Sequence, residues 1–201
     1  WGMESDGRGW LALGDVRVRV PLRGVHNLRN AMLALAVAGE QGVSMADAAR
    51  GVAAMPAPPM RVNFESYGPV TLINDAYNSN PGSARPALEL LEQAGAGRPR
   101  VAVLGTMLEL GEQADRLHDE VARAALAGPI ELVVGVGAFA DALMRVSPGD
   151  GRVATGADPG SAWTAARSRL APDAVILLKG SRGVRLEQLA PLIAEWASAP
   201  R

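Results

Sequence analysis

The chain contains no cysteine among its 201 residues, and this absence excludes disulfide bonds and thiolate catalysis. Histidine occurs only as His26 and His118, too few for a histidine-rich metal site. The formal net charge is −1, so the charge balance does not predict binding to nucleic acid or to a membrane surface. No apolar run is long enough to cross a bilayer. A lack of cysteine also fits a cytoplasmic location.

Lysine is almost absent as well. Lys179 is the single lysine, and the other 19 of the 20 basic residues are arginine. It follows the apolar run Val175–Leu178, which is typical of a strand buried on both faces. Open α/β sheets bind ligands at the carboxyl ends of such strands, where an ammonium group suits a phosphate or a carboxylate. The alternative is an ordinary lysine at a strand end whose ammonium group reaches solvent.

The order of the expected elements predicts two domains. A half-exposed strand over 11–20, a buried helix around 31–38 and a helix from Ser44 to about Met55 precede the proline-rich linker Pro56–Pro59. We place the domain boundary there, which gives domains 1–59 and 60–201.

Strands and helices then alternate, which predicts an α/β domain with a Rossmann-like, mostly parallel sheet and helices on both faces. We start the first helix at Ser83, because Pro86 then falls within its first turn. The expected strands are a hairpin at 62–67 and 70–74, followed by 100–104, 131–134, 152–154 and 174–178. The expected helices are about 83–93, 112–127, 139–146, 159–170 and 184–197.

The densest polar stretch, Asn74–Pro81, lies between an apolar strand and a helix. Asp75 at the strand end could accept a hydrogen bond from a ribose hydroxyl, and Tyr77 could lie flat on a base. Three further polar residues near the helix N-terminus suit an anion: Asn78, Ser79 and Asn80. The alternative is an Asx-rich turn that caps the helix.

Asn27 and Asn30 lie three residues apart, so one helical face presents both amides beside His26. Paired amides can bind an adenine edge, although helix capping would use the same residues. Arg61 follows the linker, and it could either hold a phosphate from a hinge or be an ordinary surface arginine. His118 falls just off the apolar face of its helix, which favours a structural role over a catalytic one.

A second glycine-rich turn, Gly135–Ala140, follows a strand and opens a helix. Asp158 lies 21 residues beyond Gly137, as in a dinucleotide-binding fingerprint. A free-standing dinucleotide-binding module is therefore an alternative function, although only 138–201 follow the turn. A P-loop cannot occur, because Lys179 is preceded by Leu178 and followed by Gly180.

Four motifs in this order resemble the Mur ligases of peptidoglycan synthesis, and among them the MurF type. The family pattern G-x-H-N-x-x-N-A looks like Gly24–Ala31, and D-x-Y-N-A-N-P looks like Asp75–Pro81. Likewise L-G-D-M-x-E-L-G looks like Leu104–Gly111, and K-G-S-R is Lys179–Arg182. Two departures stand out, since Thr106 replaces the aspartate of the third motif and Met60 replaces the glycine before Arg61.

The resemblance implies that 1–59 is the tail of a central ATP-binding domain and that 60–201 is a Mur ligase C-terminal domain. The P-loop, the catalytic carboxylate and the magnesium ligands would precede Trp1, so we expect no metal ligand here. Because Met is only the third residue, we expect a fragment of a longer polypeptide that is inactive alone.

By the same resemblance, the activity is ATP-dependent amide bond formation between UDP-N-acetylmuramoyl-tripeptide and D-Ala-D-Ala through an acyl phosphate. ATP and Mg²⁺ would be the cofactors of a cytoplasmic monomer with no nucleic-acid partner. The implied catalytic residues are Lys179 and Arg61. Those implied for the nucleotide are His26, Asn27, Asn30, Arg61, Asp75, Tyr77 and Asn78; those for the dipeptide or phosphate are Ser79, Asn80, Lys179, Ser181 and Arg182.

Another Mur ligase, or a ligase similar to folylpolyglutamate synthetase, is a further alternative. The pair Tyr77-Asn78 and the Leu104–Gly111 motif favour the MurF type over both.

Overall fold

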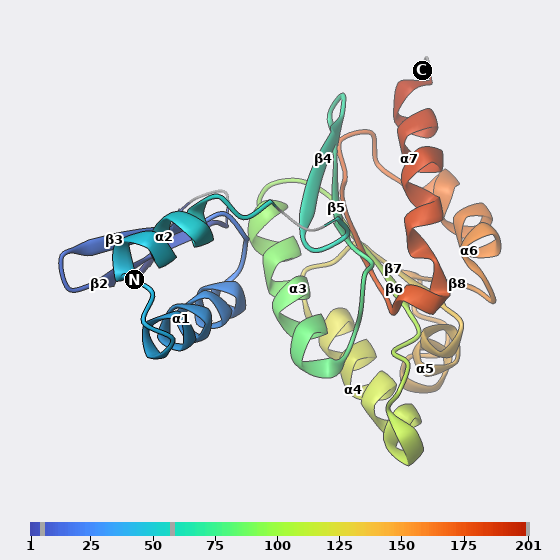
Figure 1. Ribbon diagram of the computed structural model, residues 1–201. Helices are drawn as coiled ribbons and strands as arrows, with labels where there is room; N and C mark the ends of the chain where they lie inside the picture. Colours follow the sequence, from blue (N-terminus) through green and yellow to red (C-terminus); the bar gives the residue numbers. More distant parts are fainter. Residues whose placement is uncertain (5–6, 57–58, 200–201) are drawn as a thin grey trace. The chain divides into compact units, whose positions relative to one another are not determined.

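The computed structural model describes residues 1–4, 7–56 and 59–199, and the chain divides into two compact units, Trp1–Pro58 and Pro59–Arg201 (Figure 1). The middle of the expected linker, residues 57–58, lies outside the described residues. Among the described residues there are three hydrophobic clusters, and each consists of residues from one unit only.

The first unit combines a three-stranded antiparallel sheet with two helices. Its strands are β1 (Gly2–Met3), β2 (Gly9–Leu13) and β3 (Val16–Val20), and its helices are α1 (Val25–Glu40) and α2 (Met45–Ala53). The prediction of one strand over 11–20 is wrong, because Gly14 adopts a φ of 58° and forms a two-residue turn with Asp15. The alternating residues therefore belong to a hairpin.

Helix α1 is less buried than predicted. Only Leu28, Ala31 and Leu35 are buried, while Leu33 and Val37 are exposed. Apolar residues lie on all sides of the helix, but only those on one side pack into the core of the first unit. Helix α2 begins as its capping pattern predicts, with the Oγ of Ser44 accepting a hydrogen bond from the N–H of Asp47 at 3.2 Å.

The second unit is an α/β domain around a six-stranded sheet of order β4-β5-β9-β6-β7-β8. Neighbouring strands are parallel, except that the edge strand β4 pairs antiparallel with β5. This confirms the predicted fold class. The strands are β4 (Asn63–Tyr67), β5 (Val70–Asp75), β6 (Arg100–Gly105), β7 (Leu132–Val136), β8 (Val153–Gly156) and β9 (Val175–Lys179).

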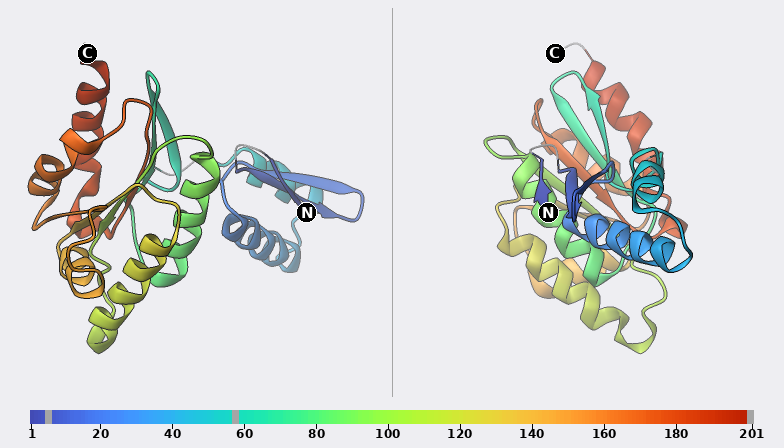
Figure 2. Two further views of the ribbon diagram at one scale, coloured as in Figure 1. Left: turned by 180° about the vertical axis from the view of Figure 1, so that it is seen from behind. Right: turned by 60° about the vertical axis from the view of Figure 1, so that its left-hand side comes forward.

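Helices cover both faces of this sheet, as the two further views in Figure 2 make clear. One face packs against α3 (Pro81–Ala94), α4 (Ala114–Ala127) and α5 (Ala138–Val146), and the other against α6 (Pro159–Ala166) and α7 (Leu189–Ser198). The central strand β9 is apolar throughout because both of its faces are buried. Val175 and Leu177 enter the first cluster, while Ile176 and Leu178 enter the second.

Helix α3 starts earlier than predicted. Asn80 is its N-cap, and Asn80 and Ser83 each accept a hydrogen bond from the backbone N–H of the other. Pro86 therefore lies inside the helix, beyond the first turn. The helix tolerates the backbone hydrogen bond that Pro86 lacks, because it is capped and buries Leu88 and Leu91.

Two other helices differ from the expected ones. The segment predicted as one helix over 184–197 contains short 3₁₀ turns before α7, because Arg185 adopts a left-handed conformation with φ 60°. In α4 the buried face consists of His118, Val121, Ala122 and Ala125, so His118 lies on the apolar face of its helix, whereas the prediction placed it just off that face.

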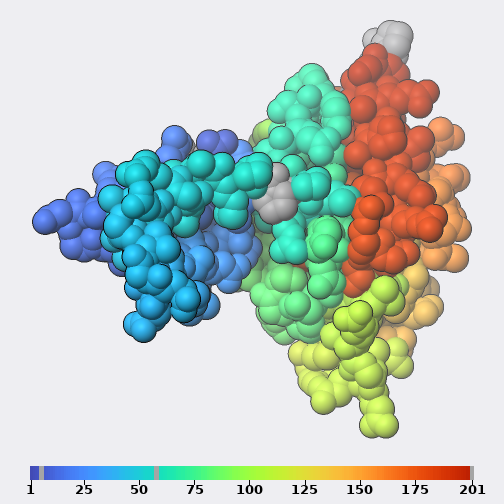
Figure 3. All heavy atoms as spheres, in the orientation of Figure 1, coloured from blue at the N-terminus to red at the C-terminus, as the bar shows by residue number. Residues whose placement is uncertain are grey.

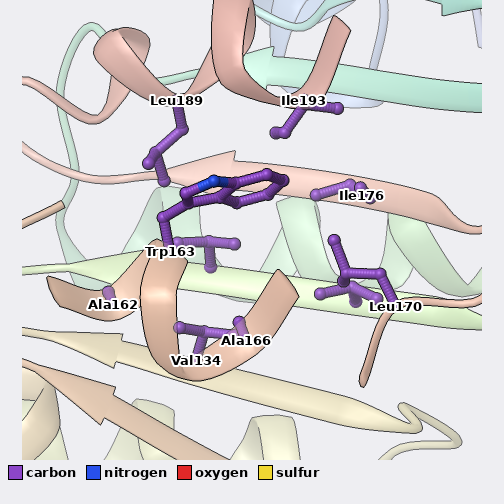
Figure 4. A pocket seen from close by; sticks show the side chains of 10 residues that line it. Val134, Ala162, Trp163, Ala166, Leu170, Ile176, Leu189 and Ile193 are labelled. Carbon is purple, nitrogen blue, oxygen red and sulfur yellow. The ribbon is translucent and has the colours of Figure 1, made fainter. Parts of the chain in front are cut away.

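A small apolar recess, partly open to solvent, lies between the sheet and helices α6 and α7 (Figure 4). The indole of Trp163 lies in it, close to Leu189, Ile193 and Ile176. The Trp163 ring also meets the Trp196 ring edge to face, with centroids 6.4 Å apart. The recess is lined by Val101, Val103, Val134, Ala162, Trp163, Ala166, Leu170, Ile176, Leu189 and Ile193.

Candidate functional site

Asp75 and Lys179 meet at the carboxyl ends of two neighbouring strands. They are register partners on β5 and β9, and Lys179 Nζ lies 3.0 Å from Asp75 Oδ2. The side chain of Lys179 is 2% exposed and that of Asp75 is 14% exposed. The ammonium group also donates to the backbone carbonyls of Asp75 and Asn78. The lysine is therefore a buried, paired cation at the predicted edge of the sheet, and its ammonium group does not reach out into solvent.

Asp75 also fixes the segment that carries Arg61. Its Oδ1 accepts a hydrogen bond from the N–H of Val62 at 3.2 Å, and the N–H of Tyr77 donates to the carbonyl of Met60 at 3.1 Å. Met60 and Val62 adopt φ angles of 55° and 56°, a region that residues other than glycine rarely adopt. The glycine of the family pattern suits the backbone at Met60, so the strained turn is retained even with methionine there.

Arg61 and Tyr77 form an exposed platform beside this pair. The guanidinium carbon of Arg61 lies 4.3 Å from the centroid of the Tyr77 ring, in a cation–π contact. Tyr77 is 42% exposed. A flat cationic and aromatic surface of this kind suits the base and phosphates of a nucleotide.

Ser181 connects the loops that follow three strands. Its Oγ accepts a hydrogen bond from the N–H of Leu108 at 2.9 Å and lies 3.4 Å from Asn78 Oδ1. The same hydroxyl lies 3.5 Å from the carbonyl oxygen of Ser79. The Oγ of Ser79 is itself buried and has no hydrogen-bond partner within the described part of the chain. This hydroxyl could therefore bind a ligand.

The other predicted dipeptide residues lie at the margin of this cluster. The side chain of Asn80 is engaged in the cap of α3. Arg182 is more than half exposed and pairs with Glu187 at 2.9 Å. To bind a ligand, the side chain of Asn80 would have to leave the cap of α3, and that of Arg182 would have to leave Glu187.

The loop after β6 is held by Thr106, whose role the sequence did not reveal, and by His118. Thr106 Oγ1 accepts a hydrogen bond at 3.0 Å from the N–H of Ala138, the first residue of α5. The N–H of Met107 donates to His118 Nε2 at 2.8 Å, and His118 Nδ1 lies 2.7 Å from the carbonyl of Ala114. His118 is thus a buried structural residue, as predicted, although it belongs to the core face of α4.

The glycine-rich turn at Gly135–Ala140 lacks the features of a dinucleotide site. Thr106 already occupies the first N–H of α5, and a Cβ at Gly137 would lie 2.5 Å from Thr106 Oγ1. Asp158 caps α6 through the N–H of Ser161 at 2.9 Å, and this hydrogen bond holds the pKa of Asp158 below its usual range. The geometry therefore gives no support to the dinucleotide-binding module.

A second group of predicted residues lies on α1 of the first unit. Asn30 Nδ2 donates to Asn27 Oδ1 at 3.3 Å, so both amides share one helical face. Asn27 also donates to the carbonyl of Arg23 at 2.8 Å, while His26 is exposed. The structure thus brings Asn27 and Asn30 together within the first unit.

The described residues contain no group of three or more His, Asp or Glu side chains that could hold a metal ion. No helix in the described part of the chain is long and apolar enough to span a membrane.

Comparisons with known proteins agree on one family. The domain family described as "Mur ligase, glutamate ligase domain" matches residues 60–182. UDP-N-acetylmuramoyl-tripeptide–D-alanyl-D-alanine ligases from Mycobacterium tuberculosis and Bacillus subtilis are 36% and 31% identical to this chain, in each case over 88% of the chain. Only 39% of each relative is covered, so the chain spans about two fifths of their length.

A solved structure extends this likeness to the fold. MurF from Acinetobacter baumannii superimposes with a TM-score of 0.79 and 28% identity, covering 94% of this chain and 42% of the other. The family match includes Arg61, Asp75 and Lys179, the residues that meet at the carboxyl edge of the sheet. On sequence and fold together, the chain belongs to the Mur ligase family.

Proposed function

We propose that this chain is the C-terminal part of an ATP-dependent ligase that adds D-alanyl-D-alanine to UDP-N-acetylmuramoyl-tripeptide through an acyl phosphate. The observation that carries the proposal is the meeting of Arg61, Asp75, Tyr77 and Lys179 at one sheet edge. The names of the relatives supply the substrates. In this proposal the first unit is the tail of a central ATP-binding domain, and the second unit is the C-terminal domain.

The nucleotide side of the site would use the exposed platform. Tyr77 offers a flat ring, and Arg61 offers a positive charge that a phosphate would draw toward itself. Asp75 would accept from a ribose hydroxyl through a second lone pair of one of its oxygens, beside its present partners Lys179 and the N–H of Val62. Asn78 borders the platform, and the amides of Asn27 and Asn30 beside His26 would contact adenine.

The acceptor side would use the buried hydroxyls. The unpartnered Oγ of Ser79 and the Oγ of Ser181 lie in loops joined by Lys179, and together they suit the carboxylate of a dipeptide. Lys179 would supply positive charge beside them. Asn80 and Arg182 flank this position.

Parts of the machinery would come from elsewhere in the ligase. Mg²⁺ and the P-loop would be held by other segments, since the donors described here do not fit the metal. We further propose that the ligase works in the cytoplasm as a monomer. Metal-bound ATP would supply the phosphoryl group, while the residues of this chain bind and orient the reactants.

The test is phosphate release from ATP in the presence of Mg²⁺, UDP-N-acetylmuramoyl-tripeptide and D-Ala-D-Ala. We expect activity from the complete ligase and none from residues 1–201 alone. Activity of the complete ligase should also depend on D-Ala-D-Ala. Phosphate release that ignores the dipeptide, or that requires a different acceptor, would contradict the proposal.

A further inference from the structure

Leu108 is an exposed apolar residue beside the cluster of polar groups. Among the described residues of the second unit, three large apolar or aromatic side chains are exposed: Tyr77 (42%), Leu108 (46%) and Met144 (53%). Two of these three border the site, and Tyr77 is already engaged by Arg61. Leu108 has no role in the nucleotide platform or in the buried hydroxyl pair.

The backbone around Leu108 is held firmly even though its side chain faces solvent. Its own N–H donates to Ser181 Oγ, and the N–H of Met107 donates to the buried His118. The carbonyl of Thr106 accepts from the N–H of Ser181 at 3.2 Å, and Glu109 adopts a φ of 64°. The backbone at Leu108 and just before it is therefore fixed by hydrogen bonds, so its exposed side chain is presented from one defined position, as a ligand contact requires.

The position of the side chain points to the acceptor side. A Cβ added at Gly183 would lie 3.0 Å from Leu108 Cδ1, so the leucine lies across the turn that follows Ser181. Figure 3 shows the segment around residue 110 at the surface, next to the segment that leads into α7. The apolar side chain of Leu108 therefore lies against the turn after Ser181, and its backbone N–H is bonded to the hydroxyl of that serine.

We propose that Leu108 determines specificity by packing against a methyl group of the incoming D-alanyl-D-alanine. The inference rests on the proposed function. Such an acceptor carries one carboxylate and two methyl groups, so its site needs an apolar surface close to its anion-binding groups. Burying a methyl group against leucine favours alanine over glycine, since one methylene-sized contact changes kcat/KM by about tenfold or more.

The test compares D-Ala-D-Ala with D-Ala-Gly and Gly-Gly as acceptors for the complete ligase. We expect Leu108→Ala to lower the kcat/KM ratio of D-Ala-D-Ala to the better glycine-containing dipeptide at least about fivefold. Leu108→Met is the matched control, and it should keep the ratio within about twofold because it remains apolar and similar in volume. The KM for ATP should not change in either variant.

An unchanged ratio in Leu108→Ala would overturn the inference. An equal loss for all three acceptors, or a raised KM for ATP, would also overturn it, because Leu108 would then contact another part of the ligase. Thermal unfolding of each variant checks that the loop remains folded. Failure of the wild-type enzyme to use D-Ala-D-Ala at all would instead refute the proposed function, a result distinct from an unchanged ratio.

Discussion

At the residue scale, the Asp75–Lys179 pair concentrates the chemistry of the second unit. Composition alone pointed to Lys179, because a chain that otherwise uses arginine has one ammonium group at the end of a buried strand. The pairing with Asp75 was not predictable, since it depends on β5 and β9 being neighbours although the residues lie 104 positions apart. Nor did the sequence indicate the positive φ of Val62, which the pair helps to hold in place.

Removing Asp75 should destabilise the chain strongly. In Asp75→Ala the ammonium group of Lys179 stays buried without its counter-charge, which typically costs about 3–5 kcal/mol. Adding Lys179→Met to this variant should recover much of the loss, because no uncompensated charge then remains. Urea denaturation of the three variants measures the effect as a double-mutant cycle. A double variant as unstable as the sum of the singles would show that the pair is not coupled.

Lys179 should also matter for catalysis. For the complete ligase, we expect Lys179→Ala to lower kcat/KM by about tenfold or more, or roughly 1.4 kcal/mol of transition-state stabilisation. Steady-state kinetics at saturating ATP checks this, with Arg98→Ala as a control because Arg98 bonds Pro69 and Asp173 carbonyls at the opposite edge of the sheet. Unchanged kinetics in folded Lys179→Ala would restrict this lysine to a structural role.

Asp75 should act on the nucleotide instead. If its carboxylate holds a ribose hydroxyl, Asp75→Asn should raise the KM for ATP more than the KM for the dipeptide, which it would affect only through the unpaired Lys179. Asparagine keeps an oxygen for the N–H of Val62, so the turn that carries Arg61 should survive. Initial-rate kinetics with each substrate varied in turn decides the point, and an unaltered KM for ATP would refute the ribose assignment.

At the element scale, helices α3 and α6 begin with nearly the same sequence, Asn80–Ala84 and Asp158–Ala162. Both have a reciprocal cap with serine three residues on and a proline in the first turn. The sequence predicted a polar turn before α3 but misplaced the first residue of the helix, because Pro86 favours a start at Ser83 whereas the cap at Asn80 fixes the start at Pro81. The βα alternation was easier to predict, since buried parallel strands such as Val175–Leu178 are apolar throughout.

The two caps should differ in their response to acid. The pKa of Asp158 is lowered in the folded chain, chiefly by the N–H of Ser161, so its stabilising effect is complete above its ordinary pKa and is lost as pH falls through the lowered value. Asn80 does not titrate. The stability difference between wild type and Asp158→Asn should therefore shrink as pH falls from about 6 to below about 3.

The reverse exchange is the matched control. Asn80→Asp should gain stability at neutral pH relative to its value in acid, because a carboxylate also interacts favourably with the N-terminus of α3. Urea unfolding at each pH measures both variants. A difference between wild type and Asp158→Asn that does not change with pH would contradict the assignment of Asp158 as an ionised cap.

At the scale of the whole molecule, the chain forms two units, each with its own hydrophobic core, and these cores differ in size. The larger unit buries both faces of a six-stranded sheet, while seven buried hydrophobic residues form the core of the smaller unit as far as the structure describes it. The composition predicted enough apolar residues for a core, and the prolines near residue 59 suggested where to divide the chain. The sequence did not predict the hairpin at 9–20, because alternation of apolar and charged residues is the same in one long strand and in two paired strands. It did not predict the exposed side of α1 either, because an apolar sequence does not show which of its residues pack against another element.

Unfolding should therefore occur in two steps. A unit of 58 residues is expected to bury a smaller share of its surface than a larger one. This unit also exposes Leu33 and Val37, so it should unfold at a lower urea concentration. Tryptophans report on both units, with Trp1 and Trp10 in the first and Trp163 and Trp196 in the second. A variant with Trp1→Phe and Trp10→Phe should show only the later fluorescence transition, while far-UV circular dichroism still shows both. Coincident transitions by the two methods in that variant would mean that the units unfold together, and a stabilising contact between them would then have to outweigh the difference in their cores.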